Sequence, residues 1–85
     1  METIKSAAIK DLVTNEVYTG RTHAIIMQNM VQVHNLKPPV DSTRFEQGFI
    51  TNENRFVSRG TAAKIAFAAF QIHREVNILY SEDIL

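Results

Sequence analysis

The stretch that decides the fold is QGFITNENRFVSRGTAAKIAFAAFQ, residues 47–71. Two short runs, QGFIT and RFVS, flank TNEN, whose asparagine and glutamate residues suit a turn, and this pattern predicts a β-hairpin. Ser58 then stands where a helix N-cap belongs, immediately before a segment rich in alanine. The stretch therefore predicts a hairpin that leads directly into a helix.

The predicted helix is apolar on nearly every side. Between Ala62 and Ile72, nine of the eleven residues are apolar, whereas a helix that covers a small sheet needs only one apolar stripe. A single small domain cannot surround such a helix. We therefore expect one face to pack on its own sheet and the other on a second copy of the protein, as in isologous dimers. The alternative is a core helix with one tolerated apolar edge.

The first half of the chain shows a similar pattern. Residues 4–10 and 17–19 lie on either side of the turn-like VTNE and predict another hairpin. Thr22 is a candidate N-cap for a helix that runs to about Asn35. Two prolines in LKPPVDS end this helix and predict a loop. The apolar stripe of the helix consists of Ile26, Met27, Met30 and Val33.

These elements define an α+β fold in the order ββαββα, with a small antiparallel sheet from two β-hairpins packed with two α-helices. The chain has 85 residues, which is room for one domain, residues 1–85. A domain of this size buries only roughly 60–65% of its unfolded surface and is marginally stable alone. We therefore expect the protein to form a homo-oligomer.

The composition argues against several classes of protein. Without cysteine, the chain has no disulfide, no thiolate metal site and no cysteine nucleophile, and we expect neither a metal nor a cofactor. No segment approaches the ~20 apolar residues of a membrane span, and the N-terminus lacks the apolar run of a signal peptide. We therefore expect an intracellular protein with no membrane partner. Nine basic residues balance nine acidic ones, which disfavours a nucleic acid polymer as partner.

Catalytic motifs are also absent from the sequence. The patterns HExxH, GxSxG and GxxxxGK[ST] do not occur. The histidines are His23, His34 and His73, and no pattern sets any of them beside a partner for acid–base catalysis. We therefore expect that the protein is not an enzyme.

The charges are unevenly distributed along the chain. From Asn54 to Arg74 the charged residues are Arg55, Arg59, Lys64 and Arg74, with no acidic residue among them. A local cationic patch on a neutral protein suits a small anionic ligand, and solvated surface charges are the alternative.

Two of these arginines stand at the entrance of the predicted second helix. A helix N-terminus offers unpaired amides and the positive end of the helix dipole, and guanidinium groups add bidentate recognition of phosphate. Gly60 would let a ligand approach the backbone, and Phe49 or Phe56 could offer a ring to a purine base. The alternative is that these phenylalanines pack in the core, which is the commoner place for a phenylalanine in a strand. Together these features predict a pocket for a compact phosphorylated ligand that carries a base.

Three segments carry a family resemblance: VYTGRTHAIIMQ, QGFITNENRFVSRGTAAKIAFAAFQI and LYSEDIL. They resemble the first family of Thoeris anti-defence proteins, which are small phage-encoded sponges. The likeness covers most of the chain, and the spaced pattern QGFxT, RFxxR, AA, AF, Q, SED is more specific than any single motif above.

The resemblance implies a phage protein in the cytoplasm of the infected bacterial host. Such a protein sequesters a cyclic ADP-ribose isomer of the glycocyclic type, the signal made by the Thoeris TIR enzyme, and blocks activation of the effector without cleaving the ligand. It also implies a homodimer, or a hexamer built from dimers, with ligand sites between protomers. Some members of the family also hold cyclic di- or trinucleotides of another defence system.

At the matching motif positions, the resemblance implies phosphate binding by Arg55 and Arg59, and base stacking by Phe49 or Phe56. The GRxH element supplies two secondary candidates, which would contact a ribose or a phosphate. The turn of the second hairpin supplies a third, which would either bind the edge of a base or ribose or have a structural role. These secondary candidates are Arg21, His23 and Asn54.

Two sites depart from the family pattern. Gly60 and Thr61 stand where acidic residues often follow the second arginine, and this makes the mouth of the pocket less negative. Phe70 stands where a glycine often precedes the glutamine, so that a bulky ring lies where another helix would approach. The alternative function is a small oligomeric phage protein that inhibits a host protein by direct binding. Such a protein has less need of an acid-free cationic stretch.

Overall fold

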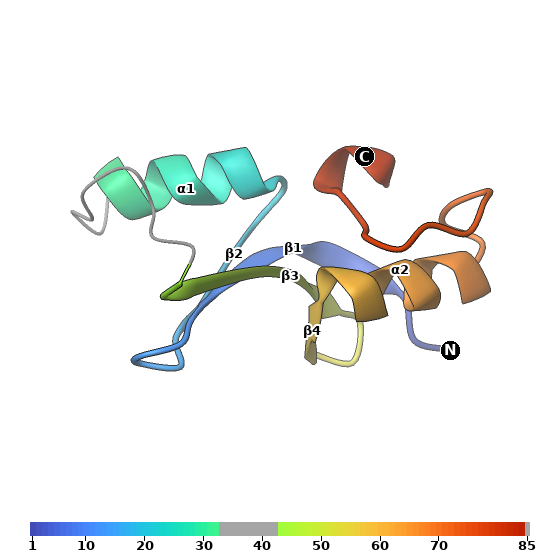
Figure 1. Ribbon diagram of the computed structural model, residues 1–85, viewed down its shortest axis with the longest axis horizontal. Coiled ribbons are helices and arrows are strands. Elements are labelled where there is room, and N and C mark those ends of the chain that lie inside the picture. The colour runs from blue at the N-terminus through green and yellow to red at the C-terminus, as the bar shows by residue number, and fades with distance from the viewer. Residues whose placement is uncertain (33–42, 85) are drawn as a thin grey trace.

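The computed structural model describes residues 1–32 and 43–84. Its elements are β1 (Ile4–Asp11), β2 (Val17–Gly20), α1 (His23–Gln32), β3 (Phe45–Thr51), β4 (Phe56–Ser58), α2 (Arg59–Ala68) and a short 3₁₀ helix, η1 (Ser81–Asp83). The strands form one antiparallel sheet in the order β2-β1-β3-β4 (Figure 1). The predicted α+β class and the ββαββα order are confirmed.

Each hairpin turns through an asparagine in the left-handed conformation, which asparagine tolerates better than most residues. The φ angles are 64° at Asn15 and 61° at Asn54. At the first turn the buried Asp11 carboxylate accepts the Val13 N–H at 2.9 Å and pairs with Arg44 at 2.9 Å. The hydrogen bond from Arg44 is the main reason that the pKa of Asp11 falls to about 2.

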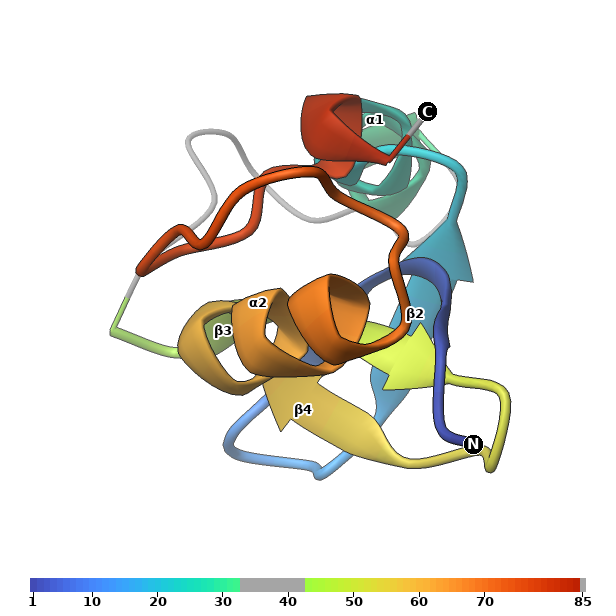
Figure 2. The ribbon, with the colours of Figure 1, turned by 90° about the vertical axis from the view of Figure 1, so that its right-hand side faces the viewer.

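Both α-helices pack on the same face of the sheet, and the chain after α2 runs back across that face toward α1 (Figures 1 and 2). Successive side chains of a strand point to opposite faces, so alternate residues meet the helices. Ile9 and Phe49 from the strands join Ile26 and Met30 from α1 in one buried cluster, which Leu79 of the C-terminal segment completes. This layer of side chains holds the helices in place.

The opposite face of the sheet carries half-buried side chains. Ser6 pairs with Ile50, and Ile50 pairs with Phe56, so these three residues share one face. The Lys10 ammonium lies 5.8 Å from the centroid of the Phe56 ring. Phe56 therefore lies on the side of the sheet away from α1 and α2.

The first helix begins where the sequence predicted. Thr22 is its N-cap, because its Oγ1 accepts the Ile25 N–H at 3.1 Å. Ile26 and Met30 are buried, and Met27 is half-buried at the edge of the core. The predicted end of the helix near Asn35, the fourth residue of its stripe, Val33, and the predicted LKPPVDS loop all lie outside the described residues.

The second helix also begins as predicted. Its N-cap is Ser58, whose Oγ accepts the Thr61 N–H at 3.2 Å. One face packs on the sheet, whereas Phe67 on another face is 40% exposed. That this second face packs on another copy of the protein stays a prediction. The residues of α2 that are buried are Ala62, Ala63 and Ala66.

The end of α2 corrects the sequence prediction. The apolar run extends to Ile72, but the last helical residue is Ala68. Phe70 takes the left-handed conformation with φ of 60°, and the Gln71 N–H reaches back to the Ala66 carbonyl at 2.8 Å. This is the Schellman closure of a helix, in which glycine is the usual left-handed residue. Apolar composition alone therefore extended the predicted helix too far.

Gln71 then fastens the end of α2 to the sheet. Its side-chain oxygen accepts the Ile4 N–H at 2.7 Å, and its side-chain nitrogen donates to the Ile4 carbonyl at 2.9 Å. The amide of Gln71 thus makes the two backbone hydrogen bonds that a further strand would make at the start of β1. This contact fixes where the C-terminal segment leaves the helix.

Candidate functional site

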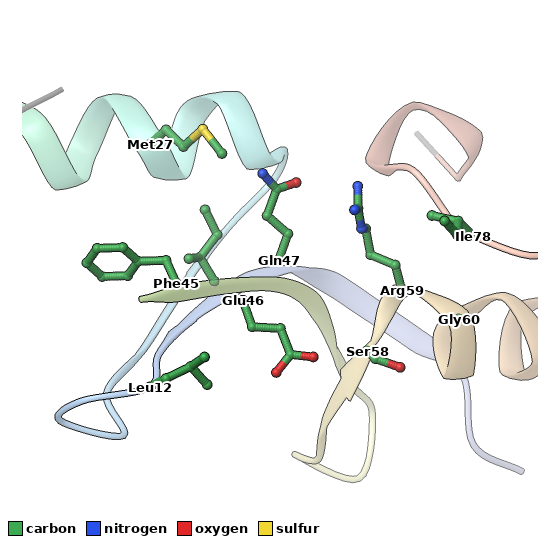
Figure 3. A pocket seen from close by; sticks show the side chains of 10 residues that line it. Leu12, Met27, Phe45, Glu46, Gln47, Ser58, Arg59, Gly60 and Ile78 are labelled. Carbon is green, nitrogen blue, oxygen red and sulfur yellow. The ribbon is translucent and has the colours of Figure 1, made fainter. Parts of the chain in front are cut away.

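A cavity of about 470 Å³ lies between α1, β3 and the start of α2 (Figure 3). Met27 of α1 stands on one side, Phe45 of β3 at the base, and Ile78 of the C-terminal segment on the other side. Polar lining comes from Glu46, Gln47, Ser58 and Arg59. Of these, Glu46 extends to the opposite side of β3 from Gln47 (Figure 3). We call this space the main cavity because Arg59 lines it. Another space, of about 610 Å³, lies beside the same end of α2, and its lining includes Gly60, Lys64 and Phe67.

The cavity exists because β4 is short. The pairs between β3 and β4 are Gly48–Ser58, Phe49–Val57 and Ile50–Phe56, so β4 leaves the Phe45–Gln47 half of β3 and turns into α2. The chain therefore delivers Arg59 and Gly60 beside an edge of β3 that β4 does not cover. The sequence predicted the short RFVS strand that ends at the Ser58 cap, but not the extension of β3 back to Phe45, and this uncovered half of β3 creates the site.

Arg59 is the cation of the main cavity. It is the first residue of α2, and its half-buried side chain points, with that of Gln47, into the space between α1 and the C-terminal segment (Figure 3). Its guanidinium carbon lies 5.6 Å from the centroid of the Tyr80 ring. Within residues 1–32 and 43–84, Arg59 forms no salt bridge. Its charge is therefore available to an anionic ligand.

A second cavity, of about 320 Å³, shares Gln47 and Arg59 with the main cavity. It lies between the N-terminal end of α1 and η1, which are neighbours in Figure 2. Its lining includes His23, Tyr80 and Glu82. We call this space the small cavity.

His23 lines the small cavity, but its ring is already engaged. Its Nε2 lies 2.8 Å from the Gly48 carbonyl oxygen. A carbonyl oxygen can only accept, so Nε2 carries a proton and donates it. The ring also meets Phe49 edge to face, with centroids 5.1 Å apart. His23 therefore lines the cavity, and only its Nδ1 remains for a further hydrogen bond.

Arg55 lies apart from Arg59, at the opposite end of β4. Its guanidinium binds both oxygens of Glu2, at 3.0 and 2.7 Å. This contact lowers the pKa of Glu2 to about 2 and raises the pKa of Arg55. Arg55 lines neither the main nor the small cavity. The two arginines that stand together in the sequence are thus separated in the folded chain.

The two candidate stacking rings are also outside the cavities. Phe49 is fully buried in the core at 0% exposure, so no face of its ring is open to a base. Phe56 is half-buried on the other side of the sheet. The cause is the alternation of a β-strand, which places Phe49 under the helices and Phe56 away from them.

The two remaining candidates lie in turns. Arg21 is exposed in the turn before α1 and lines neither cavity. The Asn54 N–H donates to the Thr51 carbonyl at 2.9 Å, and its positive φ closes the β3–β4 turn. This geometry supports the structural role, which was one of the two roles predicted for Asn54.

Several lining residues were not candidates on the sequence alone, and Gln47 and Tyr80 are the two that matter most below. Gln47 stands two residues before Phe49, and strand alternation therefore places both on the helix face. Tyr80 follows Arg59 by 21 positions, and no periodicity connects residues across such a separation. Only the return of the C-terminal segment brings its ring to Arg59.

Comparison with protein families matches residues 3–85 to the family described as Phage T4 y16D protein. Neither the curated proteins nor the solved structures provide a match. In the described part of the chain, no helix has both the length and the apolar character needed to cross a membrane. The same residues contain no group of three histidine, aspartate or glutamate side chains placed to hold a metal ion.

Proposed function

The chain belongs to the Phage T4 y16D protein family, and we propose that it is an anti-defence sponge. It sequesters a cyclic ADP-ribose isomer of the glycocyclic type, made by the Thoeris TIR enzyme, and so blocks activation of the effector in the infected host. The identity of the ligand rests on the sequence resemblance. Its chemistry agrees with the site, because such a ligand carries a pyrophosphate and a purine base.

The observation that carries the proposal is the position of Arg59. Its guanidinium faces a cavity, has no carboxylate partner in the described residues, and stands at the start of α2. The positive end of a helix dipole and a guanidinium both favour a phosphate group. Gly60, which also lines the cavity, adds no side chain to block the approach.

The size and lining of the main cavity agree with a nucleotide ligand. Small-molecule sites commonly have volumes of ~300–1,000 Å³ and combine apolar walls with a few polar groups. At about 470 Å³, the main cavity has apolar walls from Met27, Phe45 and Ile78, and its polar groups include Gln47 and Arg59 as well as Glu46 and Ser58. This combination supports binding of a compact ligand that has both a charged and an apolar part.

We propose that the ligand is held and released without cleavage, so that the protein is not an enzyme. His23 is the histidine that lines the small cavity, and its Nε2 proton is donated to Gly48. A general acid or base must be free to exchange a proton with the reacting group. The engagement of His23 therefore favours sequestration over catalysis.

We also propose that the protein is a homodimer, or a hexamer built from dimers, with ligand sites between protomers. Phe67 and Phe70 are 40% and 86% exposed on and just after α2, and large exposed apolar side chains favour association. Arg55 would contribute to such a site only across an interface and only by leaving Glu2. The oligomer thus offers the arrangement in which both arginines reach one ligand.

Thermal unfolding with a panel of ligands tests the proposal. The panel contains cyclic ADP-ribose, its glycocyclic isomers, and cyclic di- and trinucleotides. A ligand that binds only the folded protein stabilises it by about 2.7 kcal/mol at a hundredfold excess over the dissociation constant. We expect one glycocyclic isomer to raise the midpoint, and boiling to release that isomer chemically unchanged. Release of a hydrolysed product would contradict sequestration.

The variant Arg59→Ala should lose most of this ligand stabilisation, because a charge-assisted contact to phosphate is removed. The ligand-free midpoint should change little, because no salt bridge of Arg59 is broken in the described residues. Arg74→Ala, at an exposed arginine outside both cavities, is the matched control and should bind as the wild type does. Normal binding by Arg59→Ala would remove this residue from the site.

The exposed phenylalanines also support a second function, the direct inhibition of a host protein. Phe70 is 86% exposed, and a protein partner could cover it. This function predicts a stable complex with one host protein and no shift of the unfolding midpoint with any ligand of the panel. The sponge predicts the shift in purified protein alone.

A further inference from the structure

We propose that the small cavity is an adenine subsite, in which the Tyr80 ring stacks on the base and the Gln47 amide binds its edge. This inference rests on the proposed function, which supplies a ligand with an adenine base and a pyrophosphate. Arg59 then binds the phosphate between the two cavities that it shares with Gln47.

The backbone around Tyr80 holds its ring at the cavity. The residues on either side, Leu79 and Ser81, are buried. The Leu79 N–H donates to the Arg59 carbonyl at 3.1 Å, and the Asp83 carboxylate accepts the Tyr80 N–H at 2.9 Å. These contacts fix the backbone of Tyr80 next to the first residue of α2. The point from which the ring extends is therefore fixed before any ligand arrives.

The Tyr80 side chain is nevertheless open to a ligand. The residue is 51% exposed, and the Arg59 guanidinium lies 5.6 Å from the ring centroid. An aromatic ring next to an arginine matches the base and the phosphate of one nucleotide, because the ring offers a stacking surface and the arginine offers charge. Neither Phe49, which is buried, nor Phe56, on the other face of the sheet, offers this combination.

Gln47 supplies a hydrogen-bonding group at the same place. Its side chain points into the space above the sheet, next to that of Arg59 (Figure 3). Its amide has no hydrogen-bond partner among the described residues. A glutamine amide has a donor and an acceptor side by side, which match the N6 amino group and the N7 of adenine. Hypoxanthine carries an oxygen in place of that amino group and does not match.

The first test is the affinity of Tyr80 variants for the glycocyclic ADP-ribose isomers, measured by calorimetry. Stacking on a base predicts that Tyr80→Ala binds about tenfold more weakly. Tyr80→Phe keeps the ring and should bind as the wild type does, because the hydroxyl of Tyr80 has no hydrogen-bond partner among the described residues. Unchanged affinity in Tyr80→Ala would overturn the inference. An equal loss of affinity in Tyr80→Ala and Tyr80→Phe would show that the hydroxyl, and not the ring, binds the ligand, and would overturn stacking.

The second test uses the unaltered protein and so does not depend on the folding of a variant. The chain has two tyrosines, Tyr18 and Tyr80, which proton NMR can distinguish. Stacking of adenine predicts an upfield shift of the Tyr80 ring protons when the ligand is added, with Tyr18 unchanged. Unshifted Tyr80 signals in a saturated complex would overturn the inference.

The third test concerns the edge of the base. Wild-type protein should bind glycocyclic ADP-ribose more tightly than the same molecule with hypoxanthine, and Gln47→Leu should bind both equally. Equal binding of the two by the wild type would overturn the role of Gln47.

Failure of the proposed function gives a different result, because in that case no ligand of the panel binds the wild type. If a ligand binds and Arg59→Ala loses it while Tyr80→Ala retains it, only the adenine subsite is wrong.

Discussion

At the scale of single residues, Gly48 and Phe70 occupy positions with opposite requirements. A Cβ atom at Gly48 would overlap the Val57 carbonyl oxygen and lie 2.6 Å from Phe56 Cζ. Phe70 has a Cβ but adopts a φ of 60°, where glycine is favoured. The chain therefore has glycine at position 48, where there is no room for a side chain, and a bulky residue at position 70, where the backbone conformation favours glycine.

Gly48→Ala should destabilise the protein by about 1–3 kcal/mol, because β4 must move to make room for the methyl group. The midpoint of urea unfolding measures this change. Gly60→Ala is the matched control. A Cβ there meets only the Asn77 carbonyl oxygen, at an ordinary 3.5 Å, and alanine is favoured within a helix. If Gly48→Ala and Gly60→Ala are equally stable, the conclusion that position 48 has no room for a Cβ atom is wrong.

Phe70→Gly should stabilise a single folded copy by roughly 0.5–1 kcal/mol. A residue with a side chain loses about 1–2 kcal/mol of stability when it adopts the left-handed conformation, and glycine avoids this loss. Glycine is also more flexible in the unfolded chain, which cancels part of the gain. The ring is 86% exposed, so its removal sacrifices little packing within one copy. Urea unfolding at low protein concentration measures the gain. A loss of stability, with a smaller particle in light scattering, would show instead that Phe70 packs against another copy.

At the scale of elements, α2 connects stability to ligand binding. Its cap, Ser58, directs the chain from β4 into the helix, and its first residue, Arg59, faces the main cavity. Its last turn is fastened to β1 through Gln71. The position of the arginine thus depends on both ends of the helix.

Ser58→Ala should destabilise the protein by about 1 kcal/mol, because the Thr61 N–H loses its partner. Ser58→Asp keeps an N-cap oxygen and should retain the stability of the wild type. It also places a negative charge next to Arg59, so its affinity for the cyclic ligand should fall. Thermal unfolding without and with ligand separates the two effects. Wild-type affinity in Ser58→Asp would indicate that the anion does not lie at this end of α2.

At the scale of the whole molecule, two ion pairs among the described residues connect segments that are distant in sequence. Asp11 pairs with Arg44, and Glu2 pairs with Arg55. Hydrogen bonds from these arginines lower the pKa of Asp11 from 3.8 to about 2 and that of Glu2 from 4.5 to about 2. The Asp11 side chain is 3% exposed, so solvent and salt screen its pair less than the other.

Stability should therefore fall when the pH is lowered. Because the folded-state pKa values lie below the unfolded ones, both pairs stabilise the fold fully above about pH 4.5, and this contribution is lost as the pH approaches about 2. Urea midpoints across this range measure the effect. Asp11→Asn should be less stable than the wild type at neutral pH and should lose less on acidification. An equal loss in both proteins would contradict the role of Asp11.

Much of the fold could be predicted from local patterns. The asparagine turns, the caps at Thr22 and Ser58, and the strand alternation are interactions between neighbours in sequence, and the structure contains them all. The end of α2 was missed because it depends on the left-handed conformation of Phe70, which the sequence disfavours. Backbone closure and the hydrogen bonds of Gln71 to Ile4 override that preference.

The sequence by itself determined the class of the fold, the order of its elements and the presence of an arginine at the start of α2. Only the tertiary structure decided which groups meet there. It separated Arg55 from Arg59, buried Phe49, placed Phe56 on the other face of the sheet, and brought Tyr80 to Arg59. The physical reason is range: turns and caps depend on residues a few positions apart, whereas a cavity depends on strand register and on the path of the returning chain.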